Sequence, residues 1–104
     1  WLKRLGRDET FLEKSARELS GGEVQIVALV RAMQLNPSAM LLDEPTAALD
    51  QRTAEAVEAI LHDWIEAAPS RRALVWVSHD AEQNARVGNV VLRVQGGRLV
   101  DSAA

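Results

Sequence analysis

The sequence predicts an α/β fold in which a parallel sheet is flanked by helices. Two short apolar runs, residues 39–42 and 73–77, have the length and composition of buried strands in a parallel sheet. Helical patterns precede, separate and follow these two runs, and two short strand patterns end the chain. Parallel strands need crossover connections, which are usually helical, so this alternation favours a layered α/β architecture.

The N-terminal segment, residues 1–18, is rich in charge and contains a few large apolar residues. This pattern indicates one or two short amphipathic helices, with a break near Gly6 and the polar run 8–10. A sharper helix start follows at Ser20 and Glu23, which form an S-x-x-E capping box. In this motif each side chain binds a free backbone N–H of the first helical turn.

The helix that begins there is expected to be buried. Apolar residues predominate from Val24 to Met33, and Gln25 and Arg31 are the main interruptions. A helix that is apolar on most of its faces is a buried one. Asn36-Pro37 ends it, because proline cannot continue the hydrogen-bond ladder.

The second half of the chain repeats this alternation. Asp50 can cap a second helix, in which an apolar face recurs at helical spacing up to Pro69. The second strand is followed by a short helix that runs through Arg86. Residues 87–94 and 98–100 then predict a hairpin with Gly96-Gly97 at the turn.

Composition excludes several classes of protein. The 104 residues contain no cysteine, which excludes disulfides, thiolate metal sites and cysteine nucleophiles. The net charge of -3 argues against the basic surface of a nucleic-acid-binding protein. No apolar run is long enough to span a bilayer. The chain starts at Trp1 without an initiator methionine, and we expect it to be a segment of a longer protein.

The glycines of Ser20-Gly21-Gly22 are unusual at a helix start, because glycine is a poor helix former. The simpler interpretation is a helix cap with a tight entry turn. The functional interpretation is an anion site, since glycines let a phosphate approach the free N–H groups of a helix N-terminus. On this second interpretation glycine is needed at position 22 for the phosphate alone, and the fold should tolerate a side chain there.

Asp43-Glu44 closes the first strand and places two carboxylates at the carboxyl edge of the predicted sheet. Open α/β sheets bind their ligands at this edge. In phosphoryl transfer one carboxylate here holds magnesium, and a second can orient or deprotonate the attacking water. A lone acidic pair is more often a pair of loop residues that cap the next element.

His79 follows the second strand in the same way. Its protonation range suits contact with a phosphate, although a lone histidine after a strand is more often a hydrogen-bonded loop residue. The other histidine, His62, is expected on the solvent side of the second helix.

The order and spacing of these features resemble a known family. Leu19-Ser20-Gly21-Gly22-Glu23 resembles the signature motif of the ATP-binding-cassette (ABC) ATPases, and residues 40–44 resemble their Walker B strand. Residues 43–50 resemble Walker B running into the D-loop, and residues 76–80 resemble the switch-histidine loop. The resemblance covers nearly the whole chain, and only residues 1–10 carry little of it.

The resemblance implies the C-terminal part of a P-loop NTPase-type parallel sheet flanked by helices, ending in a β-hairpin. Residues 1–19 would close the helical subdomain, and residues 20–104 would form the signature helix and the C-terminal part of the catalytic core. The Walker A glycine loop with its lysine, the glutamine loop and the adenine-stacking aromatic residue of the family lie upstream and are absent from this sequence. The chain alone is therefore expected to be inactive.

The resemblance also implies roles for individual residues. Asp43 would support Mg2+, Glu44 would be the general base or position the water, and His79 would contact the γ-phosphate of ATP. Asp50 would link the two sites of a dimer. The signature residues would bind ATP held by the opposite subunit, with Ser20 and Gly22 on its γ-phosphate; the full set is Ser20, Gly21, Gly22 and Glu23.

Two positions depart from the family pattern. Ile26 stands where many members have arginine, and Ala47 stands where serine is frequent in the D-loop. Neither position carries a role named above. Residues 9–19 and 64–80 are similar to small bacterial ATP-binding subunits of the iron-export type.

The leading interpretation is an ATP-hydrolysing subunit of a membrane transporter. Its expected partners are a second nucleotide-binding subunit and a transmembrane permease, at the cytoplasmic face of the plasma membrane, with no nucleic acid. The main alternative is a non-transport ABC ATPase that acts on DNA or ribosomes. A third interpretation, a non-hydrolysing partner subunit, is disfavoured because Glu44 and His79 are both present. A fourth is an α/β fragment without activity, which is what we expect of the chain on its own.

Overall fold

The chain alternates helices and strands as the sequence predicts. The computed structural model describes residues 4–5 and 16–100. A 3-10 helix (Ala16–Glu18) precedes α1 (Gly21–Gln34), β1 (Ala39–Asp43), α2 (Gln51–Glu66), β2 (Ala73–Val77), α3 (Ala81–Val87), β3 (Arg93–Gln95) and β4 (Arg98–Val100). The amphipathic helices expected before residue 16 lie outside the described residues.

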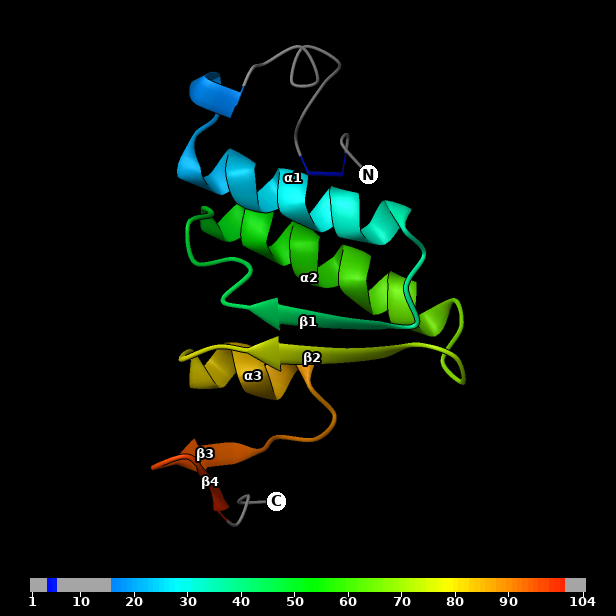
Figure 1. Ribbon diagram of the computed structural model, residues 1–104, viewed down its shortest axis with the longest axis vertical. Helices are drawn as coiled ribbons and strands as arrows, with labels where there is room; N and C mark the ends of the chain where they lie inside the picture. Colours follow the sequence, from blue (N-terminus) through cyan, green and yellow to red (C-terminus); the bar gives the residue numbers. More distant parts are fainter. Residues whose placement is uncertain (1–3, 6–15, 101–104) are drawn as a thin grey trace.

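The strands β1 and β2 form a parallel pair, in the register Ala39 with Ala73 through Asp43 with Val77. The helix α2 makes the crossover between them. In Figure 1 both strands end at the left side of the molecule, and α1, α2 and α3 all begin there. This side therefore gathers the carboxyl ends of the strands and the N-termini of the helices, which is the ligand edge of an open α/β sheet.

The hydrophobic core lies between α1, α2 and one face of this sheet. Its buried residues include Ile26 and Leu29 of α1, Met40 of β1, and Ile60 and Leu61 of α2. The core positions of α2 recur at helical spacing, as the sequence pattern predicts. His62 is exposed on the opposite side of α2, as expected.

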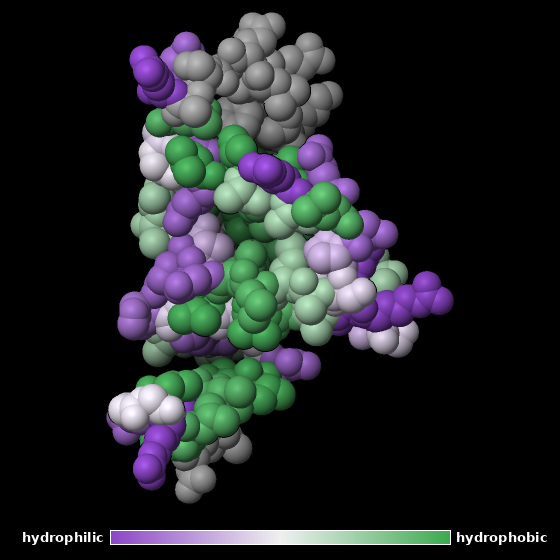
Figure 2. Space-filling model, in the orientation of Figure 1, coloured by the Kyte–Doolittle hydropathy of each residue, from purple (hydrophilic) through white to green (hydrophobic). Residues whose placement is uncertain are grey.

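The other face of the sheet is open. Leu41, Val75 and Val77 alternate with the inward-facing residues of the two strands and are at least half exposed. Figure 2 shows apolar side chains over the middle of this view, where Figure 1 places the sheet, and again over the C-terminal hairpin. Among the described residues, no helix combines the length and the apolar character needed to cross a membrane.

The hairpin is shorter than the sequence predicts. Gly96 and Gly97 have positive φ angles of 57° and 75°, which suits the expected two-residue turn. The first strand begins at Arg93 and not at Val87, which is the last residue of α3. Within the described residues, only positions 98–100 pair with this strand, so its paired length is three residues.

Candidate active site

The side chains of Glu44 and His79 meet at the carboxyl edge of the sheet. Glu44 directly follows β1, and His79 follows β2 by two residues. The backbone N–H of His79 donates to Glu44 Oε1 at 3.0 Å, and His79 Nε2 lies 3.5 Å from the same oxygen. The Glu44 side chain is 34% exposed and that of His79 is 99% exposed. The pair is thus tethered at the backbone and open to a ligand on the imidazole side.

The backbone of Glu44 is held in a strained conformation. Its φ angle is 48°, in the left-handed region, which costs a non-glycine residue about 1–3 kcal/mol. The Glu44 N–H donates to Val77 O at 2.8 Å, which extends the contact between the strands beyond the last paired residues. This turn aims the Glu44 side chain away from the direction of β1 and toward the loop that follows β2.

Asp43 is the last residue of β1 and is exposed at the same edge. It is next to Glu44 in the chain, so two carboxylates flank the end of the strand. No group of three potential metal-binding side chains occurs within residues 4–5 and 16–100. Magnesium needs no such group, because one or two protein carboxylates with water and substrate phosphates complete its shell. The exposed Asp43 carboxylate fits that kind of site.

The start of α1 carries the predicted capping box. The Glu23 N–H donates to Ser20 Oγ at 3.1 Å, and the Ser20 N–H donates to Glu23 Oε1 at 3.2 Å. A serine hydroxyl that accepts one hydrogen bond still has its own O–H to donate. Capping therefore leaves the Ser20 hydroxyl able to bind an anion.

The expectation that position 22 tolerates a side chain is wrong. A Cβ atom on Gly22 would lie 2.8 Å from the backbone oxygen of Ala48 and 3.1 Å from Leu49 Cδ2. Gly22 is thus required where the start of α1 packs against the loop between β1 and α2. Among the residues that the structure describes, a Cβ on Gly21 would meet only Ala48 Cβ, at an ordinary contact distance of 3.9 Å.

Gln25 joins α1 to the same loop. Its Nε2 donates to Glu44 O at 3.1 Å, and its Oε1 accepts from the Ala48 N–H at 3.1 Å. The sequence signal was a polar residue that interrupts an apolar helix, but its partners lie 19 and 23 residues away. Sequence reasoning did not identify Gln25 as a residue of the site.

Asp50 lies at the end of the loop and is the N-cap residue of α2, as predicted, but its side chain makes no capping hydrogen bond. Its carboxylate is exposed near the segment that Gly22 and Gln25 contact.

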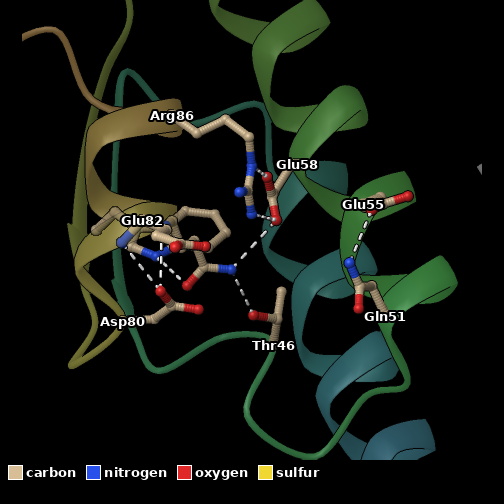
Figure 3. Close-up of polar contacts among 9 residues, drawn as sticks. Thr46, Gln51, Glu55, Glu58, Asp80, Glu82 and Arg86 are labelled. Atoms are coloured by element: carbon tan, nitrogen blue, oxygen red, sulfur yellow. Dashed lines mark hydrogen bonds and ion pairs between the residues drawn. The ribbon is translucent and has the colours of Figure 1, made fainter.

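A second polar cluster lies between α2, α3 and the loop after β1. Figure 3 shows Glu58 of α2 facing Arg86 of α3, with Thr46 on the loop beside them. Arg86 donates from Nε to Glu58 Oε1 at 2.6 Å and from Nη2 to Glu58 Oε2 at 3.0 Å. The hydrogen bond from Arg86 lowers the pKa of Glu58, against a smaller rise from burial, and Glu58 in turn raises the pKa of Arg86.

A cavity of about 290 Å³ lies far from this edge, at the carboxyl ends of α1 and α2. Asn36, Trp64 and Arg72 line part of it, and the Arg72 guanidinium lies 4.9 Å from the centre of the Trp64 ring. The cavity contains none of the predicted site residues, so the candidate site is the open edge around Glu44.

Comparison with known proteins gives matches in both sequence and fold. Residues 1–47 match the family model described as ABC transporter. The chain is 40% identical over 101 residues to the lipoprotein-releasing system ATP-binding protein LolD of Pseudomonas syringae pv. tomato, which is 97% of this chain and 43% of LolD. It is 36% identical to the tungstate uptake system ATP-binding protein TupC of Peptoclostridium acidaminophilum, over 94% of this chain and 44% of TupC.

A third relative is the probable iron export ATP-binding protein FetA of Escherichia coli, which is 34% identical over 98% of this chain and 45% of its own length. The dimeric, post-hydrolysis structure of the ATP-binding cassette MJ0796, bound to ADP and Pi, matches with a TM-score of 0.80 and 34% identity, over 94% of this chain and 41% of that chain. In sequence and fold the chain is similar to a part of these ATP-binding proteins. It spans less than half the length of these relatives.

Proposed function

We propose that the protein containing this chain is the ATP-hydrolysing subunit of an ABC transporter. The observation that carries the proposal is the contact between the Glu44 carboxylate and the loop of His79 at the ligand edge of the sheet. A carboxylate beside an exposed imidazole, at the place where α/β folds bind phosphates, suits the activation of water for attack on a phosphoryl group.

Glu44 is proposed as the general base. Its side chain is partly exposed, so an attacking water can reach it, and the backbone N–H of His79 fixes one of its oxygens. The other oxygen, Oε2, is then the one proposed to accept the proton of the water. The imidazole of His79 is proposed to donate a hydrogen bond to the γ-phosphate of ATP.

Asp43 is proposed to hold Mg2+, because its exposed carboxylate ends β1 next to Glu44. When bound, Mg2+ neutralises charge on the phosphate oxygens of ATP. ATP binding by the whole subunit is proposed from the relatives, which are ATP-binding proteins. The chain alone contains no glycine-rich phosphate loop with a lysine, and we propose that it is inactive by itself.

The start of α1 is proposed to bind ATP that is held by a second subunit. Its exposed Ser20 and the N–H groups of its first turn can bind the γ-phosphate of ATP held opposite, with Gly21, Gly22 and Glu23 shaping that turn. Asp50 is proposed to link the two sites. A dimeric assembly, as in the structures of MJ0796, supports this arrangement.

The remaining partner is proposed to be a transmembrane permease, which would hold the subunit at the cytoplasmic face of the membrane. The relatives serve uptake as well as release and export, so they favour no cargo or direction. An iron-export type stays a prediction. The division at residue 19, between the helical subdomain and the catalytic core, is likewise proposed from the family pattern.

The decisive test is Glu44→Gln in the full-length protein. Glutamine keeps the shape of the side chain and cannot take a proton, so turnover should fall by about 100- to 10,000-fold. ATP binding should persist, and the ATP-bound dimer should accumulate in light scattering. Glu66→Gln, at the exposed end of α2, is the matched control and should hydrolyse ATP normally. Near wild-type turnover in Glu44→Gln would remove Glu44 as the base.

A further inference from the structure

Gln83 of α3 is a buried amide side chain at the junction of several elements. The residue is 7% exposed, whereas most of α3 around it is open to solvent. Its Nε2 donates to Thr46 Oγ1 at 2.9 Å and to Glu58 Oε2 at 3.3 Å. Its Oε1 accepts from the indole N–H of Trp76 at 3.3 Å. A single side chain thus connects α3 with the loop after β1, with α2 and with β2.

The chemistry of the partners fixes the orientation of this amide. An indole N–H can only donate, so it requires the amide oxygen. The ionised Glu58 carboxylate can only accept, so it requires the amide nitrogen. No other uncharged side chain of this length offers an acceptor and two donors together, and a rotated amide would lose both contacts.

Glu58 is itself a fixed partner. Its side chain is 10% exposed and forms the two hydrogen bonds with Arg86 described above. Glu58 lies on α2 and Arg86 on α3, so this ion pair joins the two helices. Gln83 therefore contacts an acceptor that its own ion pair with Arg86 holds in place.

Gln83 also forms hydrogen bonds with both loops of the site. Its backbone N–H donates to Asp80 Oδ1 at 3.2 Å, and Asp80 directly follows His79. Thr46, its partner on the other loop, lies two residues after Glu44. The route from Glu44 to His79 through Gln83 thus involves a side-chain hydrogen bond to the first loop and a backbone hydrogen bond to the second.

From this arrangement we propose that Gln83 is a positioning residue that holds the Glu44 loop and the His79 loop in register for ATP hydrolysis. The proposal rests on the function proposed above and adds a residue that has no proposed contact with ATP or with the attacking water. The direct contact between Glu44 and His79 is exposed on the imidazole side, whereas the Gln83 contacts are partly buried around a residue that is 7% exposed. Gln83 therefore supplies the part of the alignment that is more shielded from water.

The consequence is a selective loss of turnover when Gln83 is changed. A shift of about 1 Å in reacting groups costs up to about 100-fold in rate, so Gln83→Leu should lower kcat by about 10- to 100-fold. The KM for ATP should change less than about twofold, because no ATP-contacting group proposed here touches Gln83. Gln83→Glu should act in the same direction, because it sets a second carboxylate against Glu58.

The test uses the full-length protein, four variants and one control variant. Gln83→Leu removes all three side-chain bonds, and Thr46→Val removes only the bond to the loop with little change of shape. Gln83→Glu is compared with the double variant Gln83→Glu, Glu58→Gln, which conserves net charge and restores a donor opposite the new carboxylate. Gln95→Leu, on the exposed strand β3, is the matched control.

The measurements are kcat, KM for ATP, melting temperature and hydrogen exchange of residues 44–48 and 78–80. We expect a low kcat with unchanged KM in Gln83→Leu and Thr46→Val, faster exchange in both loops together, and a kcat recovered at least threefold in the double variant relative to Gln83→Glu. Gln95→Leu should match the wild type throughout.

Contrary outcomes are distinct. A lower melting temperature with wild-type kcat in the folded Gln83→Leu and Thr46→Val variants would make Gln83 a purely structural residue and overturn the proposal. A raised KM with unchanged kcat would also overturn it. If the wild type does not hydrolyse ATP, or if Glu44→Gln hydrolyses it normally, the function proposed above fails and the role of Gln83 falls with it.

Discussion

The packing of α1 against the loop after β1 makes a sharp prediction about two neighbouring glycines. Gly21 and Gly22 are the first two residues of the same helix, so replacing either by alanine brings a similar gain in helix propensity, at most about 1 kcal/mol. Their surroundings differ. An added Cβ lies 3.9 Å from its nearest neighbour at position 21, and 2.8 Å from a backbone oxygen at position 22.

The magnitude follows from that difference. A contact of 2.8 Å with the Ala48 oxygen forces the helix or the loop to move, and such overpacking costs about 1–3 kcal/mol. The propensity gain cancels between the two variants, so Gly22→Ala should be about 1–3 kcal/mol less stable than Gly21→Ala. In a protein of about 150–250 residues, this difference lowers the melting temperature by about 2–12 °C.

The assay is a melting curve of each full-length variant, beside its ATPase rate. Gly21→Ala should melt at or above the wild type and keep its turnover. Gly22→Ala should melt lower and turn over more slowly, since Ala48 is also bound by Gln25, which holds the Glu44 carbonyl. If Gly22→Ala melts at or above Gly21→Ala, the packing argument is wrong. In that case the approach of a phosphate becomes the remaining reason for glycine at position 22.

Two further predictions concern the site and its surroundings. His79→Ala should lower kcat by about 10-fold or more with a smaller change in ATP affinity, and unchanged steady-state turnover would leave His79 as an ordinary loop residue. Arg86→Met should be less stable than the wild type at pH 7 in urea unfolding. Arg86 lowers the pKa of Glu58 from its ordinary value of 4.5, so the ion pair stabilises the folded protein. This contribution to the free energy of unfolding is complete above about pH 4.5 and is lost as the pH falls through the lowered pKa. The gap between the two proteins should therefore shrink at pH 3, and a gap that stays constant would contradict the ion pair as its source.

Local patterns in the sequence identified the parts of the fold that depend on neighbouring residues. The capping box of Ser20 and Glu23 spans three positions and is present in the structure. The strands at residues 39–43 and 73–77 and the turn at Gly96-Gly97 also follow from short-range composition. The length of the first hairpin strand was predicted wrongly, because strand pairing depends on which partner residues exist and not on apolar composition alone.

The contacts that bring the site together are not local. Gln83 contacts Thr46 across 37 residues and Glu58 across 25, and Arg86 contacts Glu58 across 28. No periodicity in one segment encodes such pairs. The need for glycine at position 22 was missed for the same reason, since it arises from Ala48 in another element. The roles expected for Glu44 and His79 come from the order of several motifs along the chain, which resembles a known family. Neither residue's local pattern alone predicts its role.

Two neutral amides, Gln25 and Gln83, hold the loop that follows β1 against neighbouring elements, and their chemistry suits the proposed phosphate site. Gln25 binds a carbonyl and an N–H of the loop, while Gln83 binds a hydroxyl, a carboxylate and an indole N–H. A lysine or arginine in either place could only donate and would compete for the phosphates of ATP, and a carboxylate could only accept and would repel them. An amide donates and accepts at once and adds no charge. It can therefore hold the loop without altering the electrostatic attraction that the proposed binding of ATP and Mg2+ requires. This is the physical reason to expect turnover, rather than ATP affinity, to depend on these two residues.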